Sequence, residues 1–321
     1  LSGIEICQNL EMLDCRENKL LNLNGLDKCQ NLVKLSCNQN LLMHIKLDNP
    51  NLEYIDLSYC KLKSFDFNKC EKLKYVNIKS NNLTNVSGLE KCTNLRTLKI
   101  SYNKIENLKF LKHFPNLTHL SATKCKLIDL NGIEHCSKLE TLRIKNNYIR
   151  DLKRLANLPL KTLSCCGNDL RDLEPIKHNS TLEHLYANYN GLSEIDLPYA
   201  KNLRVLSFDF NSVSSLESLS CFTKLSELYC TNNLLTSLRG LEEMYSLKYL
   251  YISNNMINSL DEISECTLLS ELYCNNNQIT SLRGISKCIE MNELSCDNNQ
   301  ITSLDDLNDL IYLNSMICDN N

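Results

Sequence analysis

The stretch that decides the fold is Leu225–Asn233, LSELYCTNN, which reads Leu-x-x-Leu-x-Cys-x-x-Asn. The same phrase returns 22 residues later at Leu247–Asn255, then at Leu269–Asn277, and then at Met291–Asn299. A fixed internal period of about 20–29 residues predicts a solenoid in which every repeat is one structural unit.

The final Asn of this phrase can be followed through the whole chain at intervals of 20 to 22 residues. We call it the ladder position. Asn occupies it 13 times and Cys twice, in the order Asn18, Asn40, Cys60, Asn81, Asn103, Cys125, Asn147, Asn168, Asn190, Asn211, Asn233, Asn255, Asn277, Asn299 and Asn321. Counted from the first Leu of each phrase, 14 complete repeats run from 10 to 312, with a partial repeat at each end.

Each repeat has two halves with different periodicities. In the first half, inward apolar residues alternate with polar ones, which predicts a short strand with one buried face. In the second half apolar residues recur every third position, as at Leu235, Leu238 and Leu241, which predicts short 3₁₀ or single-turn helical pieces. Three repeats alternate by two in this half and are expected to be extended there, at residues 45–47, 65–67 and 195–197.

The ladder Asn is expected to satisfy backbone groups in its own turn and in the next, because a carboxamide both donates and accepts hydrogen bonds. A thiol does this less well. The turns at Cys60 and Cys125 are therefore predicted to be weaker than the others.

With these phrases the chain resembles the leucine-rich repeat family, in its 22-residue class. The repeats are similar to those of the regulatory subunit of type-1 protein phosphatase and of bacterial internalins. The resemblance implies an α/β fold, a right-handed curved solenoid. A parallel β-sheet would lie on the concave face, and short 3₁₀, helical or extended segments on the convex face.

The repeats fill the chain, so residues 1–321 are expected to form a single domain whose core grows by addition of repeats. Neither end shows a capping segment. Because open solenoid ends need polar caps, we expect the native chain to be longer at both ends, or the sequence to be an excised piece.

The charge balance argues against a general nucleic-acid binder, because 35 basic and 38 acidic residues give a net charge of −3. No apolar run approaches the ~20 residues of a membrane span. We therefore expect no nucleic-acid partner and no membrane span.

The 18 cysteines follow the repeat rather than a disulfide pattern. Sixteen occupy repeat core positions: inward strand positions, ladder positions, or the position three residues before the first Leu. There a free Cys acts as a small hydrophobic residue. No C-x-x-C pair suggests a zinc site. Reduced structural thiols imply the cytosol or the nucleus.

Nothing in the sequence is typical of catalysis. Gly is scarce, at 8 residues, no phosphate-binding loop occurs, and the 6 His are scattered. We expect no enzyme activity, no cofactor and no metal site.

The outward strand positions suggest a binding face instead. Towards the C-terminus they collect aromatic and acidic residues, a combination favoured at protein interfaces. The predicted protein-binding residues on the concave face are Tyr186, Tyr189, Asp209, Phe210, Glu227, Tyr229, Tyr249, Tyr251, Glu271, Tyr273, Glu293 and Asp297. Repeats four to seven carry a second, basic patch of Lys79, Lys99, Lys124, Arg143 and Lys145, with no acid.

These observations favour a non-catalytic protein–protein interaction module whose acidic half takes a basic or aromatic-bearing partner. The segregated charges would orient that partner. The phosphatase-regulator resemblance implies a phosphatase as one candidate partner, and a regulatory or targeting role. Two alternatives remain open: the targeting arm of a larger kinase, GTPase, ligase or effector, or an architectural spacer in a cytoskeletal assembly. Tyr also suits exposed strands by propensity alone. The oligomeric state is left open.

Overall fold

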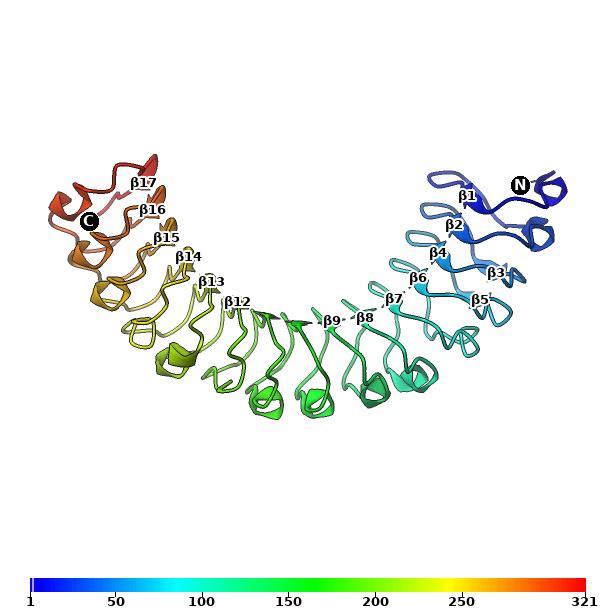
Figure 1. The fold of residues 1–321 in the computed structure, drawn as a ribbon, viewed down its shortest axis with the longest axis horizontal. Helices are drawn as coiled ribbons and strands as arrows, with labels where there is room; N and C mark the ends of the chain where they lie inside the picture. The colour runs from blue at the N-terminus through cyan, green and yellow to red at the C-terminus, as the bar shows by residue number, and fades with distance from the viewer. Residues whose placement is uncertain (2) are drawn as a thin grey trace. The chain divides into compact units, whose positions relative to one another are not determined.

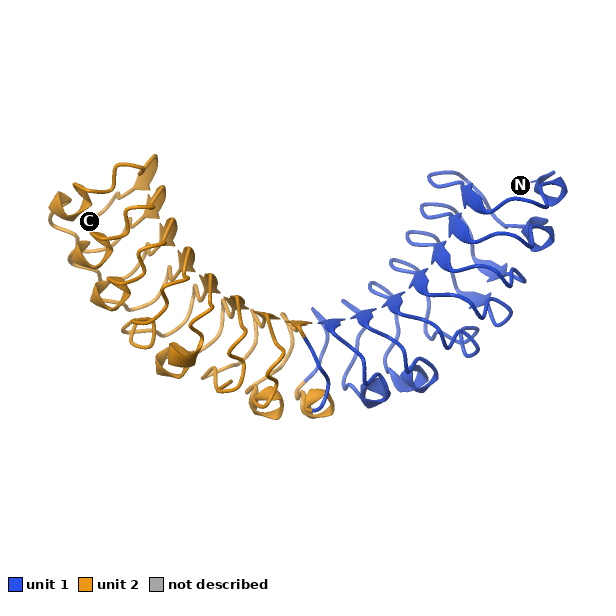
Figure 2. Cartoon of the chain, viewed as in Figure 1, with its two compact units in different colours: residues 1–149, 157–160 blue, residues 150–156, 161–321 orange. Residues whose placement is uncertain are grey.

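The first half of each repeat forms a strand of three residues, and the strands lie parallel. The computed structural model describes Leu1 and residues 3–321. It divides into two units, coloured separately in Figure 2: unit 1 comprises residues 1–149 and 157–160, and unit 2 comprises residues 150–156 and 161–321. Each unit is a stack of repeats, which confirms the predicted solenoid with a parallel sheet.

The sheet of unit 1 runs in the order β1 (Met12–Asp14), β2 (Lys34–Ser36), β4 (Tyr54–Asp56), β6 (Tyr75–Asn77), β7 (Thr97–Lys99), β8 (His119–Ser121) and β9 (Thr141–Arg143). The sheet of unit 2 runs in the order β10 (Thr162–Ser164), β11 (His184–Tyr186), β12 (Val205–Ser207), β13 (Glu227–Tyr229), β14 (Tyr249–Tyr251), β15 (Glu271–Tyr273), β16 (Glu293–Ser295) and β17 (Ser315–Ile317). Within each unit the chain order is the spatial order (Figure 1).

The register is in phase, so equivalent residues of successive repeats face one another. Glu227 pairs with Tyr249, and Tyr229 pairs with Tyr251. The first strand residues therefore form one outward column and the third strand residues another, while the middle residues point into the core. Neighbouring members of a column are about 4.8 Å apart.

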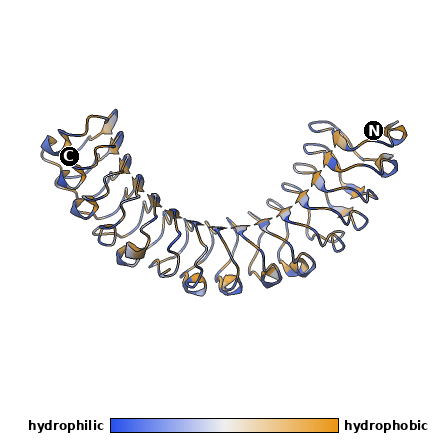
Figure 3. Ribbon diagram, viewed as in Figure 1, coloured by the Kyte–Doolittle hydropathy of each residue, from blue (hydrophilic) through white to orange (hydrophobic). Residues whose placement is uncertain are grey.

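The second half of most repeats forms a 3₁₀ turn on the other side of the stack, as expected. These turns are η1 (Ile4–Ile6), η2 (Leu26–Lys28), η3 (Lys109–His113), η4 (Ile133–His135) and η5 (Lys153–Leu155), followed by η6 (Glu174–Ile176), η7 (Glu217–Cys221), η8 (Asp261–Ile263), η9 (Arg283–Ile285) and η10 (Asp305–Leu307). Figure 3 shows that apolar and polar segments alternate along the chain. This is expected when every repeat contributes both to the core and to the surface.

Two of the three predicted extended outer segments become strands. β3 (His44–Lys46) and β5 (Ser64–Asp66) pair in parallel as a separate two-stranded sheet. Residues 195–197 form neither strand nor 3₁₀ turn. The difference lies in the adjacent repeats. β3 and β5 belong to adjacent repeats and pair with each other, whereas the repeats on either side of residues 195–197 carry η6 and η7 and offer no extended segment for pairing.

From Asn40 to Asn299 the ladder Asn side chains are buried or half-buried, and they cross-link consecutive repeats. The Nδ2 of Asn103 donates to the carbonyl oxygens of Ile100 in its own repeat and Ile78 in the preceding repeat, both at 2.9 Å. Its Oδ1 accepts from the Leu83 backbone N–H at 3.0 Å. The amide donates and accepts as predicted, but the neighbour it serves is the preceding repeat and not the next one.

The two cysteines in the ladder make only part of this pattern. Cys125 Sγ lies 3.2 Å from the Ile100 carbonyl oxygen and Cys60 Sγ lies 3.4 Å from that of Cys37. A thiol has no carboxamide oxygen, so it lacks the acceptor that Asn Oδ1 offers to a backbone N–H of the preceding repeat. This is the geometric basis for expecting weaker turns at these repeats.

All 18 cysteines are free thiols. On the outer side, the buried thiols of Cys70, Cys92 and Cys136 contact backbone carbonyl oxygens of the preceding repeat at 3.5–3.9 Å. Burial raises the pKa of Cys70 to about 11 and that of Cys92 to about 12, so both stay protonated and act as structural donors.

The residue just before the ladder position adopts left-handed backbone angles, with φ between +51° and +58° at the non-glycine examples in 14 repeats. We call it the turn position. Asn tolerates this conformation best after Gly, and Asn fills the position in the last five repeats, at 232, 254, 276, 298 and 320. Aromatic residues fill it at Tyr59, Tyr102, Tyr189 and Phe210, where they are more strained than Asn would be.

Candidate functional site

The candidate site is built on β13 to β16 of unit 2. Three tyrosines of the second outward column, Tyr229, Tyr251 and Tyr273, stack on one another at centroid distances of 4.8 and 4.6 Å, with interplanar angles of 24° and 7°. The in-phase register produces this stack, because it sets the rings one strand spacing apart. The three tyrosines are half-buried.

Each tyrosine hydroxyl donates to a glutamate of the first outward column. Tyr251 Oη lies 2.6 Å from Glu271 Oε2, and Tyr273 Oη lies 2.7 Å from Glu293 Oε2. Both bonds reach one repeat ahead. Tyr229 instead bonds its own strand's Glu227 at 3.0 Å.

The exception at Tyr229 follows from the sequence of the next repeat. The first column of β14 holds Tyr249, which has no carboxylate to offer. We call the seven residues of this lattice the tyrosine–glutamate face: Glu227, Tyr229, Tyr249, Tyr251, Glu271, Tyr273 and Glu293.

The lattice keeps its phenols protonated. Burial and the hydrogen bond to Glu227 raise the pKa of Tyr229, and burial and the bond to Glu271 do the same for Tyr251. The bond to Glu293, with some burial, raises the pKa of Tyr273 to about 12. The hydroxyls therefore remain donors that hold the carboxylates in place.

The carboxylates are not neutralised within the described part of the chain, where no ion pair reaches Glu227, Glu271 or Glu293. Glu271 and Glu293 also face one another directly in register. Like charges opposite each other on neighbouring strands are destabilising. The face thus holds negative charge at a cost in stability and offers it to an external cation.

Tyr189 and Phe210 form a second aromatic element of unit 2, beside the strand ends. Their rings stack at 4.3 Å and 10°, and 57% of Tyr189 and 44% of Phe210 remains exposed. Both residues occupy the strained turn position. Strained, exposed aromatic side chains do not serve the core, so they are candidates for contacts with a partner.

Three predicted site residues have mainly internal contacts. The Asp209 carboxylate accepts hydrogen bonds from the Thr231 backbone N–H at 2.8 Å and from Asn188 Nδ2 at 3.2 Å, and burial raises its pKa. Asp297 accepts from Ser295 Oγ at 3.0 Å and from Asn298 Nδ2 at 2.6 Å. Tyr186 is half-buried at the end of β11, separated from the tyrosine stack by β12.

The predicted basic patch lies in unit 1 and is only partly on strands. Lys99 and Arg143 end β7 and β9, whereas Lys79, Lys124 and Lys145 lie in the turns that follow strands. The predicted patch did not include three neighbouring residues of the first outward column. Lys34, Tyr54 and Tyr75 occupy successive places of the first column, and comparing that column would have revealed them.

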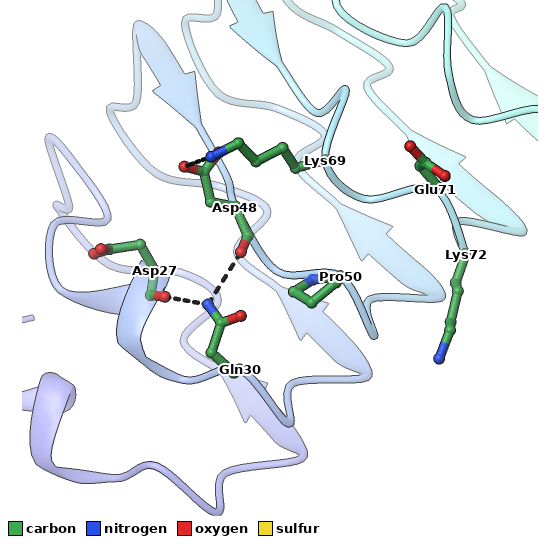
Figure 4. A pocket seen from close by; sticks show the side chains of 7 residues that line it. All are labelled: Asp27, Gln30, Asp48, Pro50, Lys69, Glu71 and Lys72. Atoms are coloured by element: carbon green, nitrogen blue, oxygen red, sulfur yellow. Dashed lines mark hydrogen bonds and ion pairs between the residues drawn. The ribbon is translucent and has the colours of Figure 1, made fainter.

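The surface of unit 1 has a hollow lined mainly by polar and charged side chains. Figure 4 shows this hollow of about 630 Å³, lined by Asp27, Gln30, Asp48, Pro50, Lys69, Glu71 and Lys72. Its polar groups bind one another: Lys69 Nζ lies 2.8 Å from Asp48 Oδ2, and Gln30 Nε2 donates to the Asp48 carbonyl at 3.1 Å. Among the described residues no group of three His, Cys, Asp or Glu side chains could hold a metal ion.

No helix in the described part of the chain has the length and apolar character needed to cross a bilayer.

The family model described as "Leucine Rich repeats (2 copies)" matches residues 71–113, 201–243, 245–287 and 267–309. Among curated protein sequences, none matches this chain.

Several solved structures share the fold. A leucine-rich repeat protein of Leptospira interrogans superposes with a TM-score of 0.91 at 24% identity, over 99% of this chain and 86% of that one. The functional domain of InlJ from Listeria monocytogenes, described as including a cysteine ladder, gives 0.79 at 26% identity, over 93% and 70%. The Arabidopsis receptor kinase HAESA, solved with the peptide hormone IDA and the co-receptor SERK1, gives 0.75 at 23% identity, over 92% and 56%.

Proposed function

Since this chain belongs to the leucine-rich repeat family, whose domains commonly bind other proteins, we propose that it is a non-catalytic interaction module. Its tyrosine–glutamate face binds a basic segment of a partner protein. The observation that carries the proposal is the lattice of stacked tyrosines that holds three unpaired carboxylates in fixed positions.

The chemistry of the face selects the partner. Lysine or arginine side chains can reach the carboxylates of Glu271 and Glu293, whose strands are neighbours at a spacing of about 4.8 Å. Binding such a cation relieves the repulsion between the two glutamates. The tyrosine edges add apolar contact area from rings that are already ordered, so little side-chain entropy is lost on binding.

The exposed pair Tyr189–Phe210 extends the proposed surface towards the N-terminal repeats of unit 2. It provides an apolar contact beside the charged lattice. Interfaces of this composition, with aromatic anchors and a polar surround, concentrate binding energy in the anchors.

The partner implied by the repeat resemblance, a type-1 phosphatase, is one protein to test against this face, and a regulatory or targeting role would follow from such binding. The free thiols fit a reducing compartment such as the cytosol or the nucleus.

The test uses a displayed library of short random peptides, selected on the wild-type chain. The selected peptides are then measured against a variant carrying Tyr229→Ser, Tyr251→Ser and Tyr273→Ser, and against the double variant Glu271→Gln, Glu293→Gln. We expect basic peptides to be enriched and each variant to weaken their affinity at least tenfold, about 1.4 kcal/mol. Raised salt should weaken binding of the wild type.

A matched control removes the same charge from exposed glutamates outside the sheet face, with Glu243→Gln and Glu290→Gln. This control should bind like the wild type. Selection of peptides without basic residues, or equal loss in the control, would refute the proposed face. Circular dichroism and urea unfolding establish that all variants fold alike.

A further inference from the structure

The sheet face of unit 1 carries lysines and tyrosines in alternating chains. In the first chain Lys34 Nζ lies 5.0 Å from the ring centroid of Tyr54, Tyr54 stacks on Tyr75 at 4.4 Å and 8°, and Lys99 Nζ lies 5.1 Å from the Tyr75 centroid. The order Lys–Tyr–Tyr–Lys follows four neighbouring strands, β2, β4, β6 and β7.

The second chain follows the turns after β4, β6, β7 and β8. Lys79 Nζ lies 5.3 Å from the Tyr59 centroid and 5.2 Å from the Tyr102 centroid, and Lys124 Nζ lies 5.5 Å from Tyr102. These are cation–π distances. We call the eight residues the lysine–tyrosine face: Lys34, Tyr54, Tyr59, Tyr75, Lys79, Lys99, Tyr102 and Lys124.

The four lysines of this face are held by aromatic rings and not by acids. No ion pair in the described part of the chain includes any of them. From β6 to β9 the outward strand positions contain no acid. Of the acids on the strands before them, Asp56 on β4 is bound to Ser58 and Asn77, and Asp14 on β1 is bound to Arg16. The ammonium groups are therefore positioned by the rings and form no ion pair with any described residue.

Two members of the face are strained. Tyr59 and Tyr102 occupy the turn position with φ of +55° and +58°, and about half of each side chain is exposed. Asn at these positions would relieve strain but could not hold Lys79 between two rings. The choice of tyrosine serves the lysine array rather than the stability of the turn.

From these contacts we infer a second binding surface on unit 1, which takes an extended acidic segment of a protein. Carboxylates spaced along such a segment would meet ammonium groups set one or two strand spacings apart. The inference does not depend on the tyrosine–glutamate face, which lies in unit 2 and carries the opposite charge.

The rings disfavour single-stranded nucleic acid as the occupant. Base recognition of that kind needs free aromatic faces on which bases stack. Here Tyr54 lies between Lys34 and Tyr75, Tyr75 lies between Tyr54 and Lys99, and Tyr102 is approached by Lys79 from the preceding repeat and Lys124 from the following one. Both faces of these three rings are already occupied.

The test measures fluorescence anisotropy of a labelled poly-glutamate peptide and of a labelled single-stranded oligothymidylate, at low and at physiological salt. The informative variant is Lys79→Gln, Lys99→Gln, Lys124→Gln. Its charge-matched control is Lys63→Gln, Lys91→Gln, Lys112→Gln, which removes exposed lysines outside the sheet face. We expect the wild type and the control to bind poly-glutamate alike, and the informative variant to bind at least tenfold more weakly.

A second variant separates binding from folding. Tyr59→Asn together with Tyr102→Asn should unfold at an equal or higher urea concentration, because Asn suits the turn position, and yet bind poly-glutamate more weakly. Absence of poly-glutamate binding at low salt, equal weakening in both lysine variants, or tighter binding of the oligothymidylate through the same three lysines would each overturn the inference.

Discussion

Replacing Cys125 by Asn should stabilise unit 1, although it places a polar amide at a fully buried position. Cys and Asn side chains are similar in size, so the change adds hydrogen-bonding groups without demanding space. At the equivalent position Asn103 makes three bonds, at 2.9, 2.9 and 3.0 Å. Cys125 has thiol contacts of 3.2 and 3.7 Å, both to carbonyl oxygens.

The magnitude follows from the bonds gained. An amide at position 125 would donate to the carbonyl oxygens of Ile100 and Ala122 and accept from the Ile105 backbone N–H. A buried hydrogen bond contributes about 0.5–1.5 kcal/mol net. Two added bonds and one strengthened contact therefore raise the free energy of unfolding by about 1–2 kcal/mol. With an m-value of about 3 kcal/mol/M, the urea midpoint rises by roughly 0.5 M.

The assay is urea unfolding followed by circular dichroism, with hydrogen exchange at the Ile105 amide as a local probe. The reciprocal change Asn103→Cys should lower the midpoint. As a control, Cys230→Asn should destabilise unit 2, because that inward strand position is fully buried and offers the amide no ladder partners. A lower midpoint for Cys125→Asn, or unchanged exchange at Ile105, would refute the account of the ladder.

Three further outcomes are expected. Phe210→Asn should be more stable than Phe210→Ala by about 0.5–1 kcal/mol in urea unfolding, because both lose the stack on Tyr189 but Asn better tolerates the positive φ; equal midpoints would contradict the strain argument. Glu271→Gln should keep its bond from a tyrosine hydroxyl and raise the free energy of unfolding by up to about 0.5 kcal/mol, because it removes repulsion from Glu293; a marked loss of stability would show that the charge is needed for folding. The hydrogen bond to Glu293 raises the pKa of Tyr273 to about 12, so its contribution to stability is complete below pH ~10 and is lost as the pH rises towards 12. The measurement is the difference between the absorbance titrations of the wild type and of Tyr273→Phe. A difference centred near pH 10 would contradict the prediction.

The order of the repeats and the identity of the inward residues could be predicted because both are periodic in the sequence. The strand triplets, the 3₁₀ turns and the outer strands β3 and β5 all follow from the spacing of apolar residues. Residues 195–197 were only partly predicted. Their own sequence pattern is that of an extended segment, but a strand also needs an extended segment in an adjacent repeat to pair with, and the adjacent repeats carry 3₁₀ turns instead.

The candidate site divides in the same way. The sequence identified the tyrosines and glutamates of unit 2 as outward and clustered. It could not show that Tyr251 bonds Glu271 ahead while Tyr229 turns back to Glu227, because that depends on register and side-chain reach. In unit 1 it identified Lys79, Lys99 and Lys124 but not Lys34, and it could not show that these lysines lie over tyrosine rings of neighbouring repeats.

The sequence by itself determined which face of each repeat is buried, since a three-residue strand leaves one choice consistent with its apolar residues. It also determined the ladder, because one position holds Asn in 13 of its 15 occurrences. The tertiary structure decided which outward side chains meet. Residues about 22 apart in the chain become neighbours at one strand spacing. Stacked rings, hydrogen bonds between side chains and charges without an ion pair then lie together on surfaces that a partner could recognise.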